Sequence, residues 1–204
     1  MRVIAGTAKG RTLDAPRGGA TRPATDRIRE TLFAILEPIL GDARVLDLFA
    51  GAGTLGIEAL SRGSASVTFV ERSPEALKTL RKNITTSGFD DQAEVVGANV
   101  LAFLEQSVAP SYDLVFCDPP FADVPILEAT LAHPRLAAAL APEAYVIARV
   151  MRKHQPRLPD GSRVFRAREI GEETLLFLRY DLARTRPETK FSGEDEGRST
   201  SEAR

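Results

Sequence analysis

The sequence has 204 residues and a mass of 22.1 kDa, with 43% hydrophobic residues and a formal net charge of −1. This length suits one ordinary domain with a substantial core. The single cysteine, Cys117, excludes an internal disulfide and any multi-cysteine metal site. No apolar run approaches the roughly 18 residues of a membrane span, and the start lacks a signal-peptide core. We therefore expect a cytoplasmic protein that does not bind membranes.

The charge is segregated along the chain. Residues 1–30 carry seven Lys and Arg against three Asp and Glu, and residues 149–168 carry seven against one. Residues 31–148 carry seven basic against fifteen acidic side chains. Two basic segments around an acidic middle are typical of a protein that meets a polyanion through local patches, although arginines can also simply solvate loops.

The first predicted elements are a short strand or hairpin in the first dozen residues and a helix over 25–36. The hairpin carries Lys9 and Arg11. The predicted helix has one apolar face, formed by Ile28, Leu32, Ile35 and Leu36. Pro38 is expected to end this helix nearby because a proline lacks the backbone N–H group.

From residue 43 to residue 150 the pattern alternates between strands and helices. Five short segments are rich in β-branched or aromatic residues and predict strands over 43–49, 66–71, 93–97, 112–118 and 144–150. The clearest helix between them has Ser73 as its N-cap, Pro74 in its first turn and Gly88 as its stop. Strands joined by helices indicate right-handed βαβ units and a mostly parallel sheet.

The alternation stops after residue 156. Two further strands, over 163–170 and 174–182, are separated by a short Gly-Glu-Glu segment and predict a terminal antiparallel hairpin. Almost nothing after Arg184 is apolar, so the last residues are predicted to be disordered. We expect three parts, namely a basic N-terminal hairpin extension (1–20), one α/β domain (21–183) and a disordered tail (184–204).

A glycine pattern lies directly between the first of the five strands and the next helix. Gly51, Gly53 and Gly56 fit the G-x-G-x-x-G fingerprint, and Glu71 follows at the end of the next strand, where it can accept hydrogen bonds from ribose hydroxyls. The pattern alone is compatible with a nicotinamide dinucleotide, with S-adenosylmethionine or with a simple tight turn. Asp47 favours S-adenosylmethionine, because a carboxylate repels a pyrophosphate and attracts an ammonium group.

The third strand is followed by Asn99 and Val100. An asparagine side chain offers both a donor and an acceptor, so Asn99 could face the edge of an adenine, with Val100 beneath the ring. A surface loop asparagine is the alternative interpretation.

The fourth strand ends in Asp118, Pro119, Pro120 and Phe121. A carboxylate only accepts hydrogen bonds, so Asp118 suits an amino group, which has N–H bonds to donate. The prolines stiffen the backbone, so the Pro119 carbonyl can serve as a second acceptor, while Phe121 offers a face to a planar base. Cys117 is predicted to pack on the opposite face from Asp118, which argues against a cysteine nucleophile.

These motifs resemble those of known enzymes. The segment 118–121, together with 47–56, is similar to class I S-adenosylmethionine-dependent amino-methyltransferases that act on adenine N6, cytosine N4 or guanine N2. More narrowly, the chain resembles the bacterial 16S ribosomal RNA guanine-N2 methyltransferase family in segments 2–16, 21–33 and 55–71. The resemblance covers residues 2–181.

The resemblance implies a Rossmann-like class I methyltransferase fold, with a mostly parallel seven-stranded sheet, helices on both faces and a C-terminal antiparallel hairpin. It implies S-adenosylmethionine as the methyl donor, with no metal. The implied cofactor-binding residues are Thr25, Asp47, Phe49, Gly51, Gly53, Glu71, Arg72, Asn99 and Val100. The implied catalytic residues are Asp118, Pro119, Pro120 and Phe121.

The implied partner is 16S ribosomal RNA, either free or within a small subunit, and the target base must leave its stack to react. Candidates for RNA contacts are Lys9, Arg11, Arg17, Arg22, Arg27, Arg29, Arg149, Arg152, Lys153 and Arg157. No dimerisation feature is visible, so a monomer is expected. Three alternatives remain open: an adenine-N6 or other amino-methyltransferase on DNA or RNA, an NAD(P)-dependent oxidoreductase, and a non-catalytic RNA-binding module.

Overall fold

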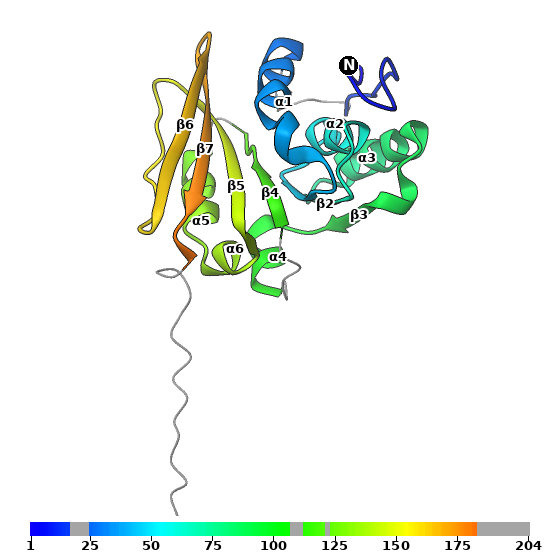
Figure 1. Cartoon of the computed structure of the whole chain (residues 1–204). Coiled ribbons are helices and arrows are strands. Elements are labelled where there is room, and N and C mark those ends of the chain that lie inside the picture. The colour runs from blue at the N-terminus through cyan, green and yellow to red at the C-terminus, as the bar shows by residue number, and fades with distance from the viewer. Residues whose placement is uncertain (17–24, 107–111, 121–122, 183–204) are drawn as a thin grey trace, which may run out of the picture.

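The computed structural model describes residues 1–16, 25–106, 112–120 and 123–182, which build an open sheet with helices on both faces (Figure 1). The strands are β1 (Arg44–Leu48), β2 (Ser66–Glu71), β3 (Ala93–Gly97), β4 (Tyr112–Cys117), β5 (Leu140–Met151), β6 (Ser162–Ile170) and β7 (Glu173–Tyr180). The helices are α1 (Asp26–Leu40), α2 (Thr54–Ser61), α3 (Pro74–Ser87), the 3₁₀ helix η1 (Asp90–Gln92), α4 (Val100–Gln106), α5 (Val124–Leu131) and α6 (Pro134–Ala138).

The sheet has the strand order β3-β2-β1-β4-β5-β7-β6. Strands β1 to β5 pair in parallel, β7 is antiparallel to β5, and β6 is antiparallel to β7. The order reverses between β1 and β4, and ligands of open α/β sheets bind at the carboxyl ends of the strands at such a switch point. This arrangement confirms the predicted mostly parallel sheet with a terminal hairpin.

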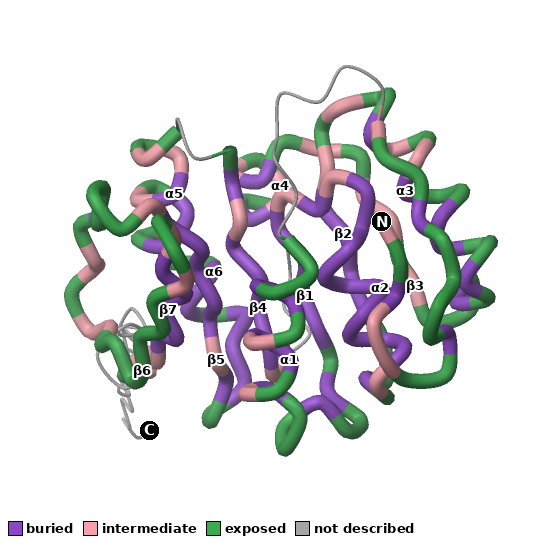
Figure 2. The backbone as a smooth tube through the Cα atoms, turned by 90° about the horizontal axis from the view of Figure 1, so that it is seen from above, coloured by how far each residue is buried: buried purple, intermediate pink, exposed green. Residues whose placement is uncertain are grey.

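Two apolar clusters pack against the two faces of the sheet. Residues of α1, α2 and α3 form one cluster with alternate strand residues, and Phe33 of α1 meets Phe116 of β4 edge to face with ring centroids 5.9 Å apart. Residues of α4, α5 and α6 form the other, which includes Cys117 and Leu127. Figure 2 shows α1 on one side of the buried strands and α4 and α5 on the other. Strands covered on both faces explain the nearly continuous apolar runs in the sequence.

Helix α1 is longer than predicted. It begins after Thr25, whose side chain accepts a hydrogen bond from the Ile28 amide, and it passes through Pro38 to Leu40. The proline lies in the last turn, where its missing N–H group costs the helix the bond to the Ala34 carbonyl. Leu40 is 1% exposed, and burial of a leucine contributes about 1.5–3 kcal/mol. Packing of the last turn therefore offsets the proline, and the helix ends two residues past Pro38.

Helix α3 matches its prediction. Ser73 caps it by accepting from the Ala76 amide, and Gly88 ends it with a φ of 78°. Strand β5 begins at Leu140, four residues before the predicted start, because Leu140 already pairs with Tyr112 across an irregularity in β4.

The N-terminal segment packs into the main core. Its antiparallel turn is closed by a bridge between Arg2 and Thr12, and Val3 and Leu13 are each only 1% exposed. The buried Glu58 of α2 accepts from the backbone amides of this segment at 2.8 and 3.0 Å. The predicted N-terminal hairpin is thus represented by a single antiparallel bridge, and the predicted tail 184–204 lies outside the described residues. No helix among the described residues is long and apolar enough to cross a membrane.

Candidate active site

The glycine loop connects β1 to α2 and has two left-handed glycines, Gly51 with φ 56° and Gly53 with φ 80°. A Cβ atom on Gly53 would lie 2.3 Å from the Leu80 side chain, and one on Gly56 would lie 2.2 Å from the Phe69 ring. These two glycines therefore let α2 approach β2 and α3 closely. A Cβ on Gly51 would meet no atom nearer than the Phe49 carbonyl at 4.0 Å, so this glycine faces open space.

Asp47 lies beneath this loop at the carboxyl end of β1. Its side chain is 2% exposed, and Oδ2 accepts a hydrogen bond from the Gly56 amide at 3.0 Å. Burial raises the pKa of Asp47 to about 8, while the Gly56 amide opposes the shift and the Asp118 and Glu71 carboxylates add to it. The Asp47 side chain thus accepts the hydrogen bond of an amide in the first turn of α2. This amide is not free to bind a pyrophosphate, as amides at a helix N-terminus otherwise can.

Glu71 closes the other side of the loop from the end of β2. One carboxylate oxygen accepts from the Gly51 amide at 2.8 Å, and the other accepts from the Arg72 and Ser73 amides at 2.9 and 2.7 Å. Three backbone donors fix the orientation of this carboxylate. The structure thus brings together the glycine loop and the acid that the sequence places twenty residues later.

The remaining predicted cofactor residues are spread around this edge of the sheet. Asn99 is exposed and caps α4, since its side-chain oxygen accepts from the Leu101 amide at 2.9 Å. Val100 is 4% exposed and belongs to the core, so little of its side chain is free to meet a ring. Phe49 is half-buried with a φ of 63°, whereas Thr25 is exposed at the start of α1.

Asp118 is held by an arginine from the neighbouring strand. Arg149 of β5 donates to both carboxylate oxygens, with Nε 2.9 Å from Oδ1 and Nη2 3.0 Å from Oδ2. Its third nitrogen, Nη1, donates to Glu173 of β7 at 2.9 Å. The Arg149 side chain is 8% exposed, and the side chains of Asp118 and Glu173 are each 16% exposed. A carboxylate, a guanidinium and a second carboxylate thus form a partly buried chain across three strands.

Burial raises the pKa of Asp118, and the negative charge of Glu173 adds to this shift. The Arg149 guanidinium opposes it by charge and by hydrogen bonding. A carboxylate can accept about four hydrogen bonds and Arg149 supplies two, so Asp118 retains acceptor capacity for an additional donor.

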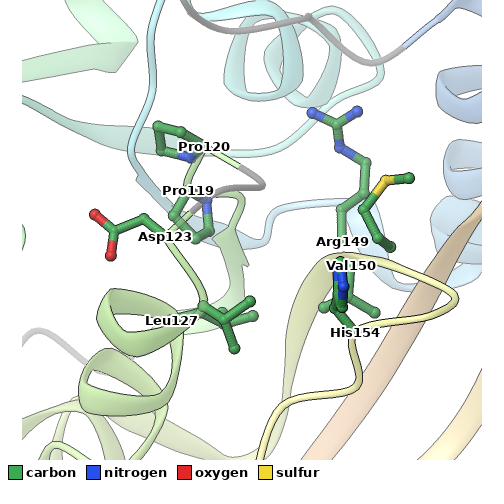
Figure 3. Close-up of a pocket in the computed structure, with 9 residues that line it drawn as sticks. Pro119, Pro120, Asp123, Leu127, Arg149, Val150 and His154 are labelled. Atoms are coloured by element: carbon green, nitrogen blue, oxygen red, sulfur yellow. The ribbon is translucent and has the colours of Figure 1, made fainter.

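The two prolines after Asp118 border a small pocket. Figure 3 shows Pro119, Pro120 and Asp123 on one side of the pocket and Arg149 and His154 on the other. Leu127 of α5 and Val150 also line it, whereas Asp118 does not. Phe121, which was predicted to offer a face to a base, lies outside the described residues.

Two arginines predicted to contact RNA are not on the surface. Arg29 is fully buried, where it pairs with Asp26 at 2.7 Å and with Glu58 at 3.6 Å. Arg149 donates its hydrogen bonds to Asp118 and Glu173, as described above. The pair with Asp26 lies within α1, whereas the pair of Arg29 with Glu58 and both pairs of Arg149 join separate elements, and spacing along the sequence does not identify such partners. Both predictions are therefore corrected, since a buried and paired guanidinium cannot reach a phosphate.

The other described candidates for RNA contacts are exposed. They are Lys9, Arg11, Arg27, Arg152, Lys153 and Arg157. Arg11 donates to the Thr86 carbonyl, and Arg152 lies 3.7 Å from Glu169. The N-terminal segment and the loop after β5 lie toward opposite ends of the sheet (Figure 1). Arg17 and Arg22 lie outside the described residues.

Glu173 was not among the predicted site residues, and Arg149 pairs with acids instead of lying free on the surface as predicted. A signal was present, since Arg149 is the only charged residue in the apolar stretch Tyr145–Val150, and a buried arginine requires acidic partners. Cys117 is fully buried on the face opposite Asp118, as predicted, and burial raises the pKa of its thiol. Among the described residues no group of three His, Cys, Asp or Glu side chains is placed to hold a metal ion.

An open sheet of this strand order, with a glycine loop after β1 and acids at the ends of β1, β2 and β4, defines a class I methyltransferase fold. This fold is shared by an RNA methyltransferase from Salinibacter ruber in complex with S-adenosyl-L-homocysteine, with 17% identity, coverage of 76% of this chain and 92% of that chain, and a TM-score of 0.59. A family model described as conserved hypothetical protein 95 matches residues 1–179, and the chain belongs to this family.

Two relatives from Escherichia coli show how far the similarity extends. The solved structure of yhhF is 34% identical, with coverage of 88% of this chain and 97% of that chain and a TM-score of 0.77. Ribosomal RNA small subunit methyltransferase D from strain K12 is 46% identical over 121 residues. That match spans 59% of this chain and 60% of the relative.

Proposed function

We propose that the protein transfers a methyl group from S-adenosylmethionine to the exocyclic N2 amine of a guanine in 16S ribosomal RNA. The observation that carries this proposal is the position of Asp118, Pro119 and Pro120 at the same sheet edge as the glycine loop, Asp47 and Glu71. The name of the Escherichia coli relative supports ribosomal RNA of the small subunit as the substrate. Guanine N2 rests on the family resemblance of the sequence.

The residues of the glycine loop fit S-adenosylmethionine. Gly51 leaves open space where a nucleoside can approach the backbone, and Glu71 lies beside it to accept from ribose hydroxyls. With a pKa of about 8, Asp47 mostly holds a proton near neutral pH in the free protein, and an ammonium group beside it would favour loss of that proton and then pair with the carboxylate. The bond that Asp47 accepts from the Gly56 amide disfavours a phosphate. This combination favours a methyl donor over a nicotinamide dinucleotide. When bound, S-adenosylmethionine supplies a methyl group on a positively charged sulfur, which is open to attack by a nitrogen.

Asp118 and the Pro119 carbonyl act on the target amine. The N2 nitrogen of guanine is a poor nucleophile because its lone pair is delocalised into the ring. Two acceptors for its N–H bonds favour the pyramidal nitrogen of the transition state and orient its lone pair. The attacking nitrogen gains positive charge and is then acidic enough to lose a proton without a strong base. Positioning can lower a barrier by about 7–11 kcal/mol, whereas one charged hydrogen bond contributes about 1.5–3 kcal/mol.

Arg149 keeps Asp118 in its acceptor form. A protonated carboxyl would turn one oxygen into a donor and would accept from the amine more weakly, without a negative charge. The guanidinium opposes the effect of burial on the pKa of Asp118 and fixes the plane of the carboxylate through two parallel bonds. Arg149 is thus a positioning residue that acts through Asp118, and Glu173 in turn orients Arg149.

The test is transfer of labelled methyl from S-adenosylmethionine to 16S ribosomal RNA, offered naked and in 30S particles, followed by nucleoside identification. Label in N2-methylguanosine is the expected result, and the preferred form would show when in assembly the enzyme acts. Label in N6-methyladenosine would instead favour an adenine methyltransferase. Absence of transfer to both forms, with S-adenosylmethionine bound, would overturn the proposed substrate. Sedimentation of the purified protein would test the expected monomer.

The variant Asp47→Asn should separate stability from cofactor binding. With a pKa of about 8 in the folded protein and 3.8 as its ordinary value, Asp47 holds a proton that the unfolded chain has released between these pH values. The unfolded state binds fewer protons there, so stability falls with rising pH by up to about 1.4 kcal/mol per unit. Asparagine cannot lose this proton, so the variant should resist urea better than the wild type near pH 8.

The same variant should bind S-adenosylmethionine at least about tenfold more weakly, because the bond to the ammonium group loses its charge. Urea denaturation at about pH 5.5 and 8 and calorimetric titration with the cofactor measure both effects. Parallel stability curves for the variant and the wild type would contradict the raised pKa. Unchanged cofactor affinity would remove Asp47 from the binding site.

A further inference from the structure

Strand β6 forms the free edge of the sheet and carries a basic surface that the methyltransferase site does not use. Residues 163 to 169 are all exposed, and Figure 2 shows this strand at the outer end of the sheet. Three of the seven are arginines, namely Arg163, Arg166 and Arg168. Edge strands often carry basic residues to prevent pairing with other sheets, so the charge alone is not evidence of a ligand.

The strand register places the three arginines on one face. Arg166 pairs with Phe177 and Arg168 pairs with Leu175, and both partners belong to the core beneath α1. Residues directly opposite in neighbouring strands share a face of the sheet. Arg163 pairs with Arg179, which is two residues beyond Phe177 and therefore on this face as well. The three arginines thus lie on the face of the sheet that α1 covers, to which Arg149 also belongs.

An irregularity in β6 adds an aromatic ring to this surface. The register shifts between Val164 and Arg166, which turns Phe165 toward Tyr145. The two ring centroids are 5.6 Å apart, and the Arg179 guanidinium lies 4.3 Å from the Tyr145 ring and 5.2 Å from the Phe165 ring. Phe165 is nevertheless 55% exposed. An exposed ring that is held in place by neighbours can stack on a base with little loss of side-chain freedom.

The three arginines are not neutralised by the described part of the chain. Nearby acids are engaged elsewhere, since Glu143 pairs with Arg179 and Glu169 pairs with Arg152. Glu169 is opposite Thr174, which places it on the other face of the hairpin. Among the described residues, no ion pair involves Arg163, Arg166 or Arg168.

The arginine surface of β6 lies at the same level along the strands as the candidate active site. Arg168 is opposite Leu175, Leu175 is opposite Arg149, and Arg149 bonds to Asp118. Neighbouring strands are about 4.8 Å apart, so three spacings place the backbone of Arg168 about 14 Å from that of Asp118. A nucleic acid strand that enters the site can therefore continue onto the hairpin.

We propose that Arg163, Phe165, Arg166 and Arg168 form a docking surface for single-stranded RNA that flanks the target nucleotide. The arginines contact phosphates and Phe165 stacks on one unpaired base, a combination typical of proteins that hold single strands. This proposal rests on the proposed ribosomal RNA substrate. It adds a binding element outside the basic residues that the sequence singled out.

The contribution of the three arginine charges to RNA binding is tested with the variant R163Q/R166Q/R168Q, which keeps long side chains at these positions. Its affinity for naked 16S ribosomal RNA and for an oligouridylate of about 20 nucleotides should fall at least about tenfold near 0.1 M salt. The slope of log affinity against log salt should decrease by about 2, since each phosphate contact to a single strand contributes about 0.7. The control R44Q/R81Q/R135Q removes three exposed charges on other elements and should keep the wild-type slope.

The contribution of the Phe165 ring to base stacking is tested with the variant Phe165→Ala. Loss of one stacked base should weaken oligouridylate binding by at least about fivefold while leaving the salt slope unchanged. Ultraviolet cross-linking of the wild-type protein to the same oligonucleotide, followed by peptide mapping, should identify the peptide over 162–170. This measurement does not depend on whether a variant folds.

Wild-type affinity and salt slope in the triple variant, or a cross-link that maps elsewhere, would overturn the docking surface. So would a loss of affinity that is restricted to 30S particles, because it would indicate a ribosomal protein as the partner. If the wild-type protein methylates no ribosomal RNA but the triple variant loses RNA binding as stated, the docking surface stands and the proposed function fails. The two proposals therefore fail separately.

Discussion

Replacement of Asp118 by alanine is expected to reduce methyl transfer at least about a hundredfold while S-adenosylmethionine affinity stays within a few fold. The effect on turnover follows because the carboxylate acts on the amine in the transition state, and loss of one such group costs about 10²–10³ in rate. Cofactor affinity is expected to change little because Asp47 and Glu71, the residues proposed to bind the cofactor, have their own backbone partners. Single-turnover rates and calorimetric titration measure the two quantities separately.

Asp118→Asn serves as the matched variant, because it keeps the shape and one acceptor oxygen but loses the charge. Its rate should lie between those of the wild type and the alanine variant. The alanine substitution deprives Arg149 of one partner and the asparagine substitution weakens that pair, but Glu173 still accepts from Nη1 at 2.9 Å, so the fold should persist. Turnover within about threefold of the wild type in the alanine variant would exclude Asp118 as the acceptor for the amine.

The arrangement of the glycine loop and its two acids could be predicted from the sequence because its geometry is local. Asp47, the glycines and Glu71 lie within one strand-loop-helix-strand unit, where spacing alone determines which residues meet. The observed bond between Glu71 and the Gly51 amide is the contact that such a unit produces. Helix α3 was also predictable, since its N-cap serine and terminal glycine are signals within the helix itself.

The pairing of Asp118 with Arg149 could not be predicted in the same way. It depends on the register between β4 and β5, which shifts between Tyr112 and Leu114, and no local signal marks that shift. The second acid, Glu173, enters because the antiparallel β7 lies beside β5. Burial of Arg29 has a similar cause, since its partner Glu58 belongs to another helix. Charge counts along the chain cannot separate such buried arginines from exposed ones.

Replacement of Arg149 by methionine is expected to move the acid limb of the pH–rate profile to higher pH. Without the guanidinium, burial and the charge of Glu173 act unopposed on Asp118, so its pKa rises above that in the wild-type protein. The carboxyl is then protonated at a pH where the wild-type enzyme has an ionised acceptor. Activity should fall at the acid end of the profile and recover as the pH is raised. Loss of one partner of a buried pair also costs about 3–5 kcal/mol of stability.

A second variant, at a residue that faces Asp118, is expected to move the acid limb of the pH–rate profile in the opposite direction. Arg149 lies on β5, Glu173 on β7 and Asp47 on β1, where the charge of Asp118 contributes to the raised pKa of Asp47. Glu173→Gln removes a charge that raises the pKa of Asp118, so its acid limb should move to lower pH while the arginine stays in place. If Arg149 served only to hold the strands together, the two variants would lose activity in proportion to stability and keep the wild-type pH profile. Opposite displacements of the acid limb are expected only if the guanidinium controls the ionisation of Asp118.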